Sequence, residues 1–93
     1  MSQIELVKAR RLRPLSDYRL DIEFSDGSSG VADLSDFVMT GPMMEPLRDQ
    51  GFFAQIFIEM GVPTWPNGCD IDPTALRMHL KESGQLHMPM AAE

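Results

Sequence analysis

Four side chains of the types that bind metal ions or attack substrates lie close together in the last third of the chain: Cys69, Asp70, Asp72 and His79. Thiolate, carboxylate and imidazole groups are the usual zinc ligands, but structural zinc sites combine them at recurring spacings that this stretch does not show. Asp72 is followed by Pro73, a pair typical of a helix start in which the carboxylate caps the first turn. We therefore expect no bound metal and no cofactor, with Asp72 as a helix cap.

Two further groupings could support catalysis. A Cys69–His79 pair would act as a nucleophile with its base, but it needs a hydrogen bond of about 3 Å and an orienting third group. A pair of carboxylates for acid–base chemistry could come from Asp21, Glu23 and Asp33. The alternating pattern around Asp21 and Glu23 places them instead on the wet face of a strand, where arginines of the neighbouring strand would meet them. We therefore expect no catalytic site, with a small enzyme that uses Cys69 as an alternative.

Basic residues are concentrated near the N-terminus of an otherwise acidic chain. The protein has 8 Lys and Arg against 14 Asp and Glu, a net charge of −6 and a pI near 4.7. Phosphate and anionic lipid therefore repel it on average, and we expect weak or no nucleic-acid binding by the isolated chain. A polyanion patch would use the basic residues of the first predicted strand, namely Lys8, Arg10, Arg11 and Arg13.

Methionine is frequent, with eight residues in a chain of 93. Its flexible thioether fills irregular gaps in small cores and also forms adaptable binding surfaces. The apolar residues around Gly41–Pro42 are not required by the strand and helix patterns. They are therefore candidates for a partner surface: Val38, Met39, Met43 and Met44.

Length and composition indicate one small globular domain. A chain of 93 residues has room for one domain, and its content of 43% hydrophobic and 24% charged residues is ordinary for that class. No apolar run approaches the roughly 18 residues of a membrane span. One cysteine excludes an internal disulfide framework. We expect a cytoplasmic protein with a single domain over residues 1–84 and a disordered tail over residues 85–93.

The first third of the chain has the patterns of three antiparallel strands. Residues 18–24 alternate apolar and polar side chains, which predicts a strand with one buried face. Residues 4–13 are predicted to form a less regular strand, and either a bulge or burial on both faces would explain its broken alternation. Asp26–Gly27 is a turn signal, and residues 31–34 complete the set as a third short strand.

Short elements follow in the middle of the chain. Ser35 is expected to cap a short helix over residues 36–39, and Pro46 to open another helical turn. Residues 53–59 are apolar and rich in aromatic and β-branched side chains, which favours a strand over a helix in so short a stretch between Gly51 and Gly61. A further short strand is predicted to begin at Thr64.

A C-terminal helix completes the pattern. It is predicted to run from Pro73 to about residue 83, with Gly84 after its end and with Leu76, His79, Leu80 and Ser83 on one stripe. The fold class is therefore α+β, in the order β-β-β-α-β-β-α, with one antiparallel sheet of about five short strands. The expected core consists of Tyr18, Leu20, Ile22, Phe24, Phe53, Ile56, Ile58, Trp65, Leu76 and Leu80.

The most unusual string in the chain is Trp65-Pro66-Asn67-Gly68-Cys69-Asp70-Ile71-Asp72-Pro73. A tryptophan beside a proline-flanked turn can close one end of a small core, and Asn67–Gly68 signals a tight turn. With this string and with the segments 14–20, 24–27 and 31–34, the chain resembles the small bacterial family catalogued as domain of unknown function 2442. The resemblance implies a compact α+β domain in which Trp65, Pro66, Asn67, Gly68, Asp70, Asp72 and Pro73 are structural.

The resemblance also suggests a partner. Members of that family look like proteins encoded beside a second small protein, in an arrangement suggestive of toxin–antitoxin pairs, and no catalytic residues are carried over from them. We therefore expect a non-catalytic protein–protein interaction module, whose partner is another small protein or a second copy of this chain. A DNA-binding regulator that uses the basic N-terminal strand is the alternative.

Overall fold

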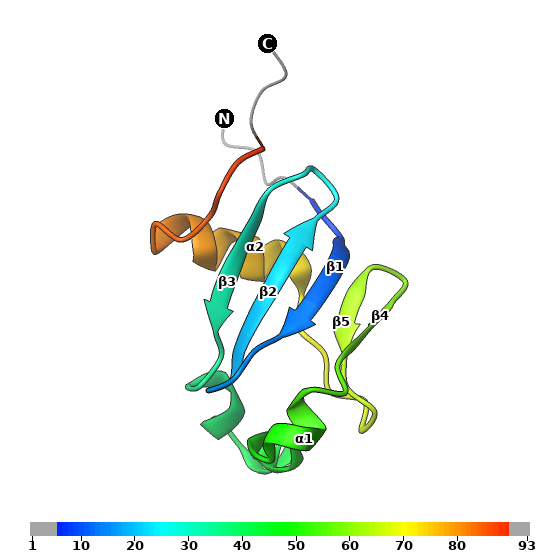
Figure 1. Cartoon of the computed structure of the whole chain (residues 1–93). Coiled ribbons are helices and arrows are strands. Elements are labelled where there is room, and N and C mark those ends of the chain that lie inside the picture. Colours follow the sequence, from blue (N-terminus) through cyan, green and yellow to red (C-terminus); the bar gives the residue numbers. More distant parts are fainter. Residues whose placement is uncertain (1–5, 90–93) are drawn as a thin grey trace.

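A three-stranded antiparallel sheet forms one layer of the computed structural model, which describes residues 6–89. Its order is β1 (Ala9–Pro14), β2 (Arg19–Phe24) and β3 (Ser29–Asp33). Helix α2 (Pro73–Glu82) lies across one face of this sheet, and the short helices of the middle segment gather beyond its lower end (Figure 1). The predicted α+β class is confirmed.

The alternation along β2 decides which face of the sheet carries the core. Leu20, Ile22 and Phe24 are completely buried, whereas Asp21 and Glu23 lie on the opposite, partly exposed face. This is the outcome that a side-chain period of two predicts.

Strand β1 is shorter than the predicted strand over residues 4–13 and carries the predicted bulge. Its register with β2 shifts between Ala9 and Arg11. Ala9 is therefore buried, while Arg11 and Arg13 are exposed. The start of the predicted strand lies outside the described residues.

The middle segment contains short helices, but they begin at other residues than predicted. Ser35 does not cap η1 (Phe37–Met39), whose N-cap position is Asp36 without a side-chain capping bond; the Ser35 amide instead donates a hydrogen bond of 3.0 Å to the Asp33 carboxylate. The next helix, η2 (Pro42–Arg48), begins at its first proline and contains Pro46 as an internal residue. Pro42 fits because the first helical turn has no partner for the missing N–H.

The predicted strand over residues 53–59 is wrong at its start. Asp49 accepts a hydrogen bond of 2.9 Å from the Phe52 amide and so caps a short helix, α1 (Gln50–Phe53). Phe53 therefore ends a helical turn, and its side chain enters the core.

The last two strands form a separate hairpin, so the predicted single sheet of about five strands is in fact two sheets. β4 (Phe57–Glu59) pairs with β5 (Val62–Thr64) across a turn in which Met60 and Gly61 both have positive φ, 51° and 83°. The second strand therefore begins two residues before the predicted Thr64. Ile58, predicted in the core, is 36% exposed, and its neighbours Phe57 and Glu59 on this three-residue strand are exposed as well.

Helix α2 begins and ends as predicted. The Asp72 carboxylate accepts a hydrogen bond of 3.0 Å from the Thr74 amide. Gly84, with φ of 78°, follows the C-terminal end. Leu76 and Leu80 are buried in the core beneath the sheet.

The buried stripe of α2 is rotated from the predicted one. It contains Arg77 beside Leu76, one turn from Leu80, whereas His79 and Ser83 are exposed. A stripe centred between positions 76 and 77 leaves positions 79 and 83 on its flank, because successive helical residues are about 100° apart. Arg77 is thus a buried charge that the pattern did not predict.

Trp65 occupies the centre of the aromatic part of the core. Its ring is fully buried, stacks on Phe37 at a centroid distance of 6.0 Å and contacts Phe53 at 5.7 Å. Tyr18, predicted in the core, is half-buried and meets Phe53 edge-on. The predicted core residues that are buried are Leu20, Ile22, Phe24, Phe53, Ile56, Trp65, Leu76 and Leu80.

The chain after α2 turns back along the sheet. Gln85 donates its amide to the Leu80 carbonyl at 2.8 Å. His87 and Ser29 exchange two backbone hydrogen bonds of 2.7 and 2.9 Å. The described part of the predicted tail, residues 85–89, thus has a defined place beside the start of β3 (Figure 1). Within residues 6–89, no helix has the length and apolar character to cross a membrane.

Candidate functional site

The Cys69 thiol is part of a closed turn and not of a nucleophilic pair. Cys69 is buried, and its thiol donates to the Met43 carbonyl at 3.2 Å. The Trp65 amide donates to the Cys69 carbonyl at 2.8 Å, and the Asn67 side chain accepts the Cys69 amide at 3.2 Å. A backbone carbonyl is not a base that could activate the thiol. We call residues 65–70 the Trp65 turn.

Three of the four residues considered as metal ligands lie along one groove, and the fourth does not. Asp70, Asp72 and His79 line one groove of about 410 Å³, together with Asp33 and Asp36. Asp72 is engaged as the helix cap, and Cys69 does not line this groove. Among residues 6–89, no three His, Cys, Asp or Glu side chains are grouped as metal ligands would be.

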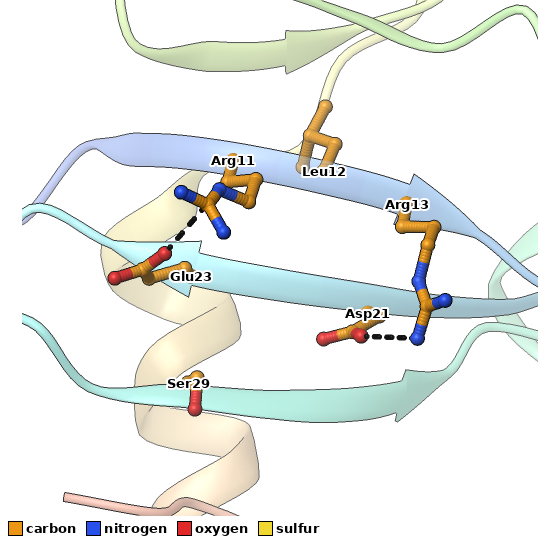
Figure 2. A pocket seen from close by; sticks show the side chains of 6 residues that line it. All are labelled: Arg11, Leu12, Arg13, Asp21, Glu23 and Ser29. Carbon is orange, nitrogen blue, oxygen red and sulfur yellow. Dashed lines mark hydrogen bonds and ion pairs between the residues drawn. The ribbon is translucent and has the colours of Figure 1, made fainter. Parts of the chain in front are cut away.

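The basic residues of β1 meet acidic residues of β2, as predicted. Arg13 and Asp21 form an ion pair of 3.1 Å, Arg11 lies 3.7 Å from Glu23, and Arg10 also pairs with Glu23. Figure 2 shows Arg11 and Arg13 reaching these carboxylates across the outer face of the sheet.

This outer face is a shallow, charged concavity of about 540 Å³. The hydrogen bond from Arg10 lowers the pKa of the Glu23 carboxyl, against an opposing effect of desolvation, and the charges of Arg10 and Arg11 lower it further. Lys8 differs from the three arginines, because its contact with Ser25 is made by the backbone. The Lys8 amide donates to the Ser25 hydroxyl at 3.0 Å. The arginines that would contact phosphate are therefore paired within the sheet.

The methionine segment contributes fewer surface residues than predicted. Val38 is completely buried within the core and so cannot belong to a partner surface, and its carbonyl accepts a hydrogen bond of 2.8 Å from Arg48. Met44 is half-buried against the core. Met39 and Met43 are exposed, 57% and 67% respectively.

Sequence reasoning missed the apolar surface of the hairpin. Phe57 and Ile58 are exposed, and Met60 at the turn is 88% exposed. These residues lie in an apolar run, which predicted a buried strand. The signal that could have corrected this prediction was Gly61, because it lies in the turn after β4 and so limits that strand to one arm of a short hairpin.

Sequence reasoning also missed an ion pair in which the arginine is buried and the aspartate is partly exposed. The Arg77 guanidinium contacts the Asp26 carboxylate at 2.9 Å and donates to the Ser28 hydroxyl at 3.2 Å. Ser28 is itself completely buried and donates its amide to Asp26 at 3.0 Å. These contacts join α2 to the turn between β2 and β3. They have no sequence signal because Arg77 and Asp26 are 51 positions apart.

Acid is expected to weaken this connection. Partial burial raises the pKa of Asp26, but hydrogen bonds from Ser28 and the charge of Arg77 outweigh it, so the pKa lies below its ordinary value of 3.8. The stability from the ionised carboxylate is present at neutral pH and is lost as pH falls below that value through the folded-state pKa. We expect Asp26→Asn to reduce the urea midpoint more at pH 7 than at pH 3. An equal reduction at both pH values would contradict this.

A protein-family model matches the part of the chain that contains the elements described above. The family model of a protein of unknown function, DUF2442, matches residues 9–82, from β1 to the end of α2. The chain belongs to the DUF2442 family. No curated protein and no solved structure matches it. The DUF2442 region includes the sheet, the hairpin, the Trp65 turn and the ion pair between Arg77 and Asp26.

Proposed function

We propose that this DUF2442 protein is a non-catalytic module that binds another protein beside its Trp65 turn. The turn buries Trp65 but exposes Pro66, Asn67 and Gly68. One exposed methionine, Met43, contacts the turn, and another, Met60, lies at the tip of the β4–β5 hairpin that leads into it. The Asn67 amide group donates to the Met43 carbonyl at 3.3 Å, and Met60 lines a depression of about 370 Å³ together with Gly68.

The observation that carries the proposal is the exposure of these neighbouring apolar side chains. Met43 is 67% exposed and Met60 is 88% exposed, and Phe57 and Ile58 are also exposed, on opposite faces of β4. Single exposed apolar residues are ordinary, whereas several neighbouring ones mark interaction sites. Methionine also adapts its shape to a partner at little cost. We call Met43, Pro66, Asn67, Gly68 and Met60 the methionine–turn surface.

The other function classes have less support. The Cys69 thiol faces a carbonyl, which disfavours an enzyme that uses it. Three of the four residues of the basic cluster form ion pairs with Asp21 or Glu23, which reduces the charge available to DNA. The partner that we propose is a second small protein encoded beside this one, as in a toxin–antitoxin pair, and the complex would act in the bacterial cytoplasm.

Charge placed on the methionine–turn surface is expected to release the partner. The double variant Met43→Glu/Met60→Glu buries carboxylates in the interface, and we expect partner affinity to fall at least tenfold. The measurement is co-purification of the tagged chain from its native host, followed by titration of the identified partner. Met78→Glu is the matched control, because Met78 is 43% exposed on α2, away from this surface.

Three results would count against this function. The wild-type chain could purify alone and show enzymatic turnover. The double variant could retain the partner with unchanged affinity. Alternatively, light scattering could show that the chain binds only itself and that the double variant dissociates this dimer, which would replace the separate partner with a second copy.

A further inference from the structure

The outer edge of β3 is open over its second half. Hydrogen bonds from Phe24 to the Ser28 carbonyl and from Leu34 to the Tyr18 carbonyl show that the even-numbered residues of this segment face β2. The backbone groups of the odd-numbered residues therefore point away from the sheet. Those of Ser29 bind His87. Those of Val31 and Asp33 have no hydrogen-bond partner among residues 6–89.

The chain itself shows that this edge accepts a strand. His87 pairs with Ser29 in antiparallel geometry through bonds of 2.7 and 2.9 Å. The residue that would come next along the same edge, Gln85, instead turns its amide to the Leu80 carbonyl of α2. The C-terminal segment thus covers the start of β3, and the backbone of Val31 and Asp33 remains uncovered beyond it.

A continuous groove runs between this open edge and α2. One depression of about 480 Å³ is lined by Val31 and Leu80. The second, the groove of about 410 Å³ described above, is lined by Leu76 and other apolar residues. Both depressions include Asp33 and His79, so they form one groove. A strand edge beside an apolar groove is the arrangement in which proteins bind extended peptides, because backbone hydrogen bonds give affinity and pockets receive alternate side chains.

The far end of the groove is acidic. Asp33, Asp36, Asp70 and Asp72 line it without a lysine or arginine, whereas Arg19 lines the other depression beside Asp33. The amide and hydroxyl of Ser35 lower the pKa of Asp33, against an opposing effect of desolvation, and the charge of Arg19 lowers it further, so Asp33 is charged at neutral pH. Asp33 and Asp72 each accept one backbone hydrogen bond. A basic occupant complements the charge of this end.

We propose that the groove between β3 and α2 binds an extended, basic segment of a partner protein as a fourth strand of the sheet. Backbone groups of that segment pair with those of Val31 and Asp33. Its apolar side chains face Leu76 and Leu80, and its lysine or arginine side chains face Asp36 and Asp70. This inference rests on the proposed function, because both take the partner to be a protein. It concerns a different surface from the methionine–turn surface.

The test uses a peptide of ten residues in which valine and lysine alternate, with acetylated and amidated ends. Titration into the ¹⁵N-labelled full chain at 50 mM salt should shift the Val31 and Asp33 amide signals and slow their hydrogen exchange. Asp36→Lys/Asp70→Lys should weaken this binding at least tenfold and should favour the same peptide with glutamate in place of lysine. Val31→Pro removes an outward N–H without breaking the ladder to β2 and should abolish the exchange protection.

Several outcomes would overturn the inference. The Val31 and Asp33 amides could stay unchanged at millimolar peptide, or the valine–glutamate peptide could bind the wild-type chain equally well. Protection of the same amides that rises with protein concentration alone would identify a second copy as the occupant. If Val31→Pro does not fold, the charge-reversed variant still decides. Met43→Glu/Met60→Glu should leave peptide binding unchanged, so the failure of this inference is distinguishable from failure of the proposed function.

Discussion

Replacing Trp65 with alanine is expected to lower the free energy of unfolding by about 3–5 kcal/mol, the range for deleting a large buried aromatic ring. The ring is completely buried between Phe37 and Phe53, and its indole N–H donates to the Phe53 carbonyl at 3.0 Å. The substitution therefore leaves a cavity and removes a hydrogen bond to a helix end. Because small domains have a total stability of about 5–10 kcal/mol, much of it should be lost.

Urea unfolding followed by circular dichroism measures this effect, because Trp65 is the chain's single tryptophan and its fluorescence is lost with it. Trp65→Phe retains a ring but lacks the donor, so its cost should be smaller, about 1–2 kcal/mol. Phe57→Ala is the matched control, since Phe57 is 43% exposed and its loss should cost under about 1 kcal/mol. Equal midpoints for Trp65→Ala and Phe57→Ala would show that Trp65 does not hold the core together.

Local patterns in the sequence predict the elements that local physics determines. The alternation of Leu20, Ile22 and Phe24 with charged residues identified both the strand and its buried face. The Asp72–Pro73 pair identified the start of α2, because a cap and a preset backbone angle act within a few residues. The family resemblance, which rests most on the Trp65 turn, is confirmed over residues 9–82.

Features that depend on distant segments could not be predicted in this way. Phe53 and Ile58 occur in one apolar run, yet the first is buried against Trp65 and the second is exposed on a hairpin. Propensity alone does not distinguish them, because strand-forming residues are also the residues that fill cores. Val38 was misassigned to the surface because the core residues that its side chain joins come from distant parts of the chain.

The open edge of β3 and the groove beside it depend on the order of the strands and on the path of the chain after α2. The pattern of residues 31–34 predicts a short strand but does not show which neighbour it lacks. The acidic residues of the groove were considered as candidate metal ligands because Asp70, Asp72 and His79 are near one another in sequence. The structure adds Asp33 from the end of β3 and Asp36 from the segment that follows it, and gives the cluster an apolar floor.

Replacing Arg77 with methionine is expected to cost about 2–3 kcal/mol of unfolding free energy. The guanidinium is buried, and its contacts of 2.9 and 3.0 Å to the Asp26 carboxylate connect α2 to the β2–β3 turn. Breaking a buried pair costs about 3–5 kcal/mol, but the Asp26 side chain is 31% exposed, so water compensates part of the loss. Asp26→Ala should cost more than Arg77→Met, because it removes the carboxylate from the more deeply buried partner.

The difference between a buried and an exposed ion pair makes this prediction testable within one protein. Arg13→Met breaks the pair with Asp21, whose side chains are 73% and 36% exposed, and should cost less than about 0.5 kcal/mol. In a double-mutant cycle, Asp26→Ala should cost less in the Arg77→Met background than in the wild type, because the second substitution removes a charge that has already lost its partner. Equal costs for Arg77→Met and Arg13→Met, or simple additivity in the cycle, would contradict a stabilising role for the buried pair. If the measurements confirm the pair, Arg77 holds the turn before β3 in place, and with it the groove beside α2. No local pattern of the sequence distinguishes this arginine.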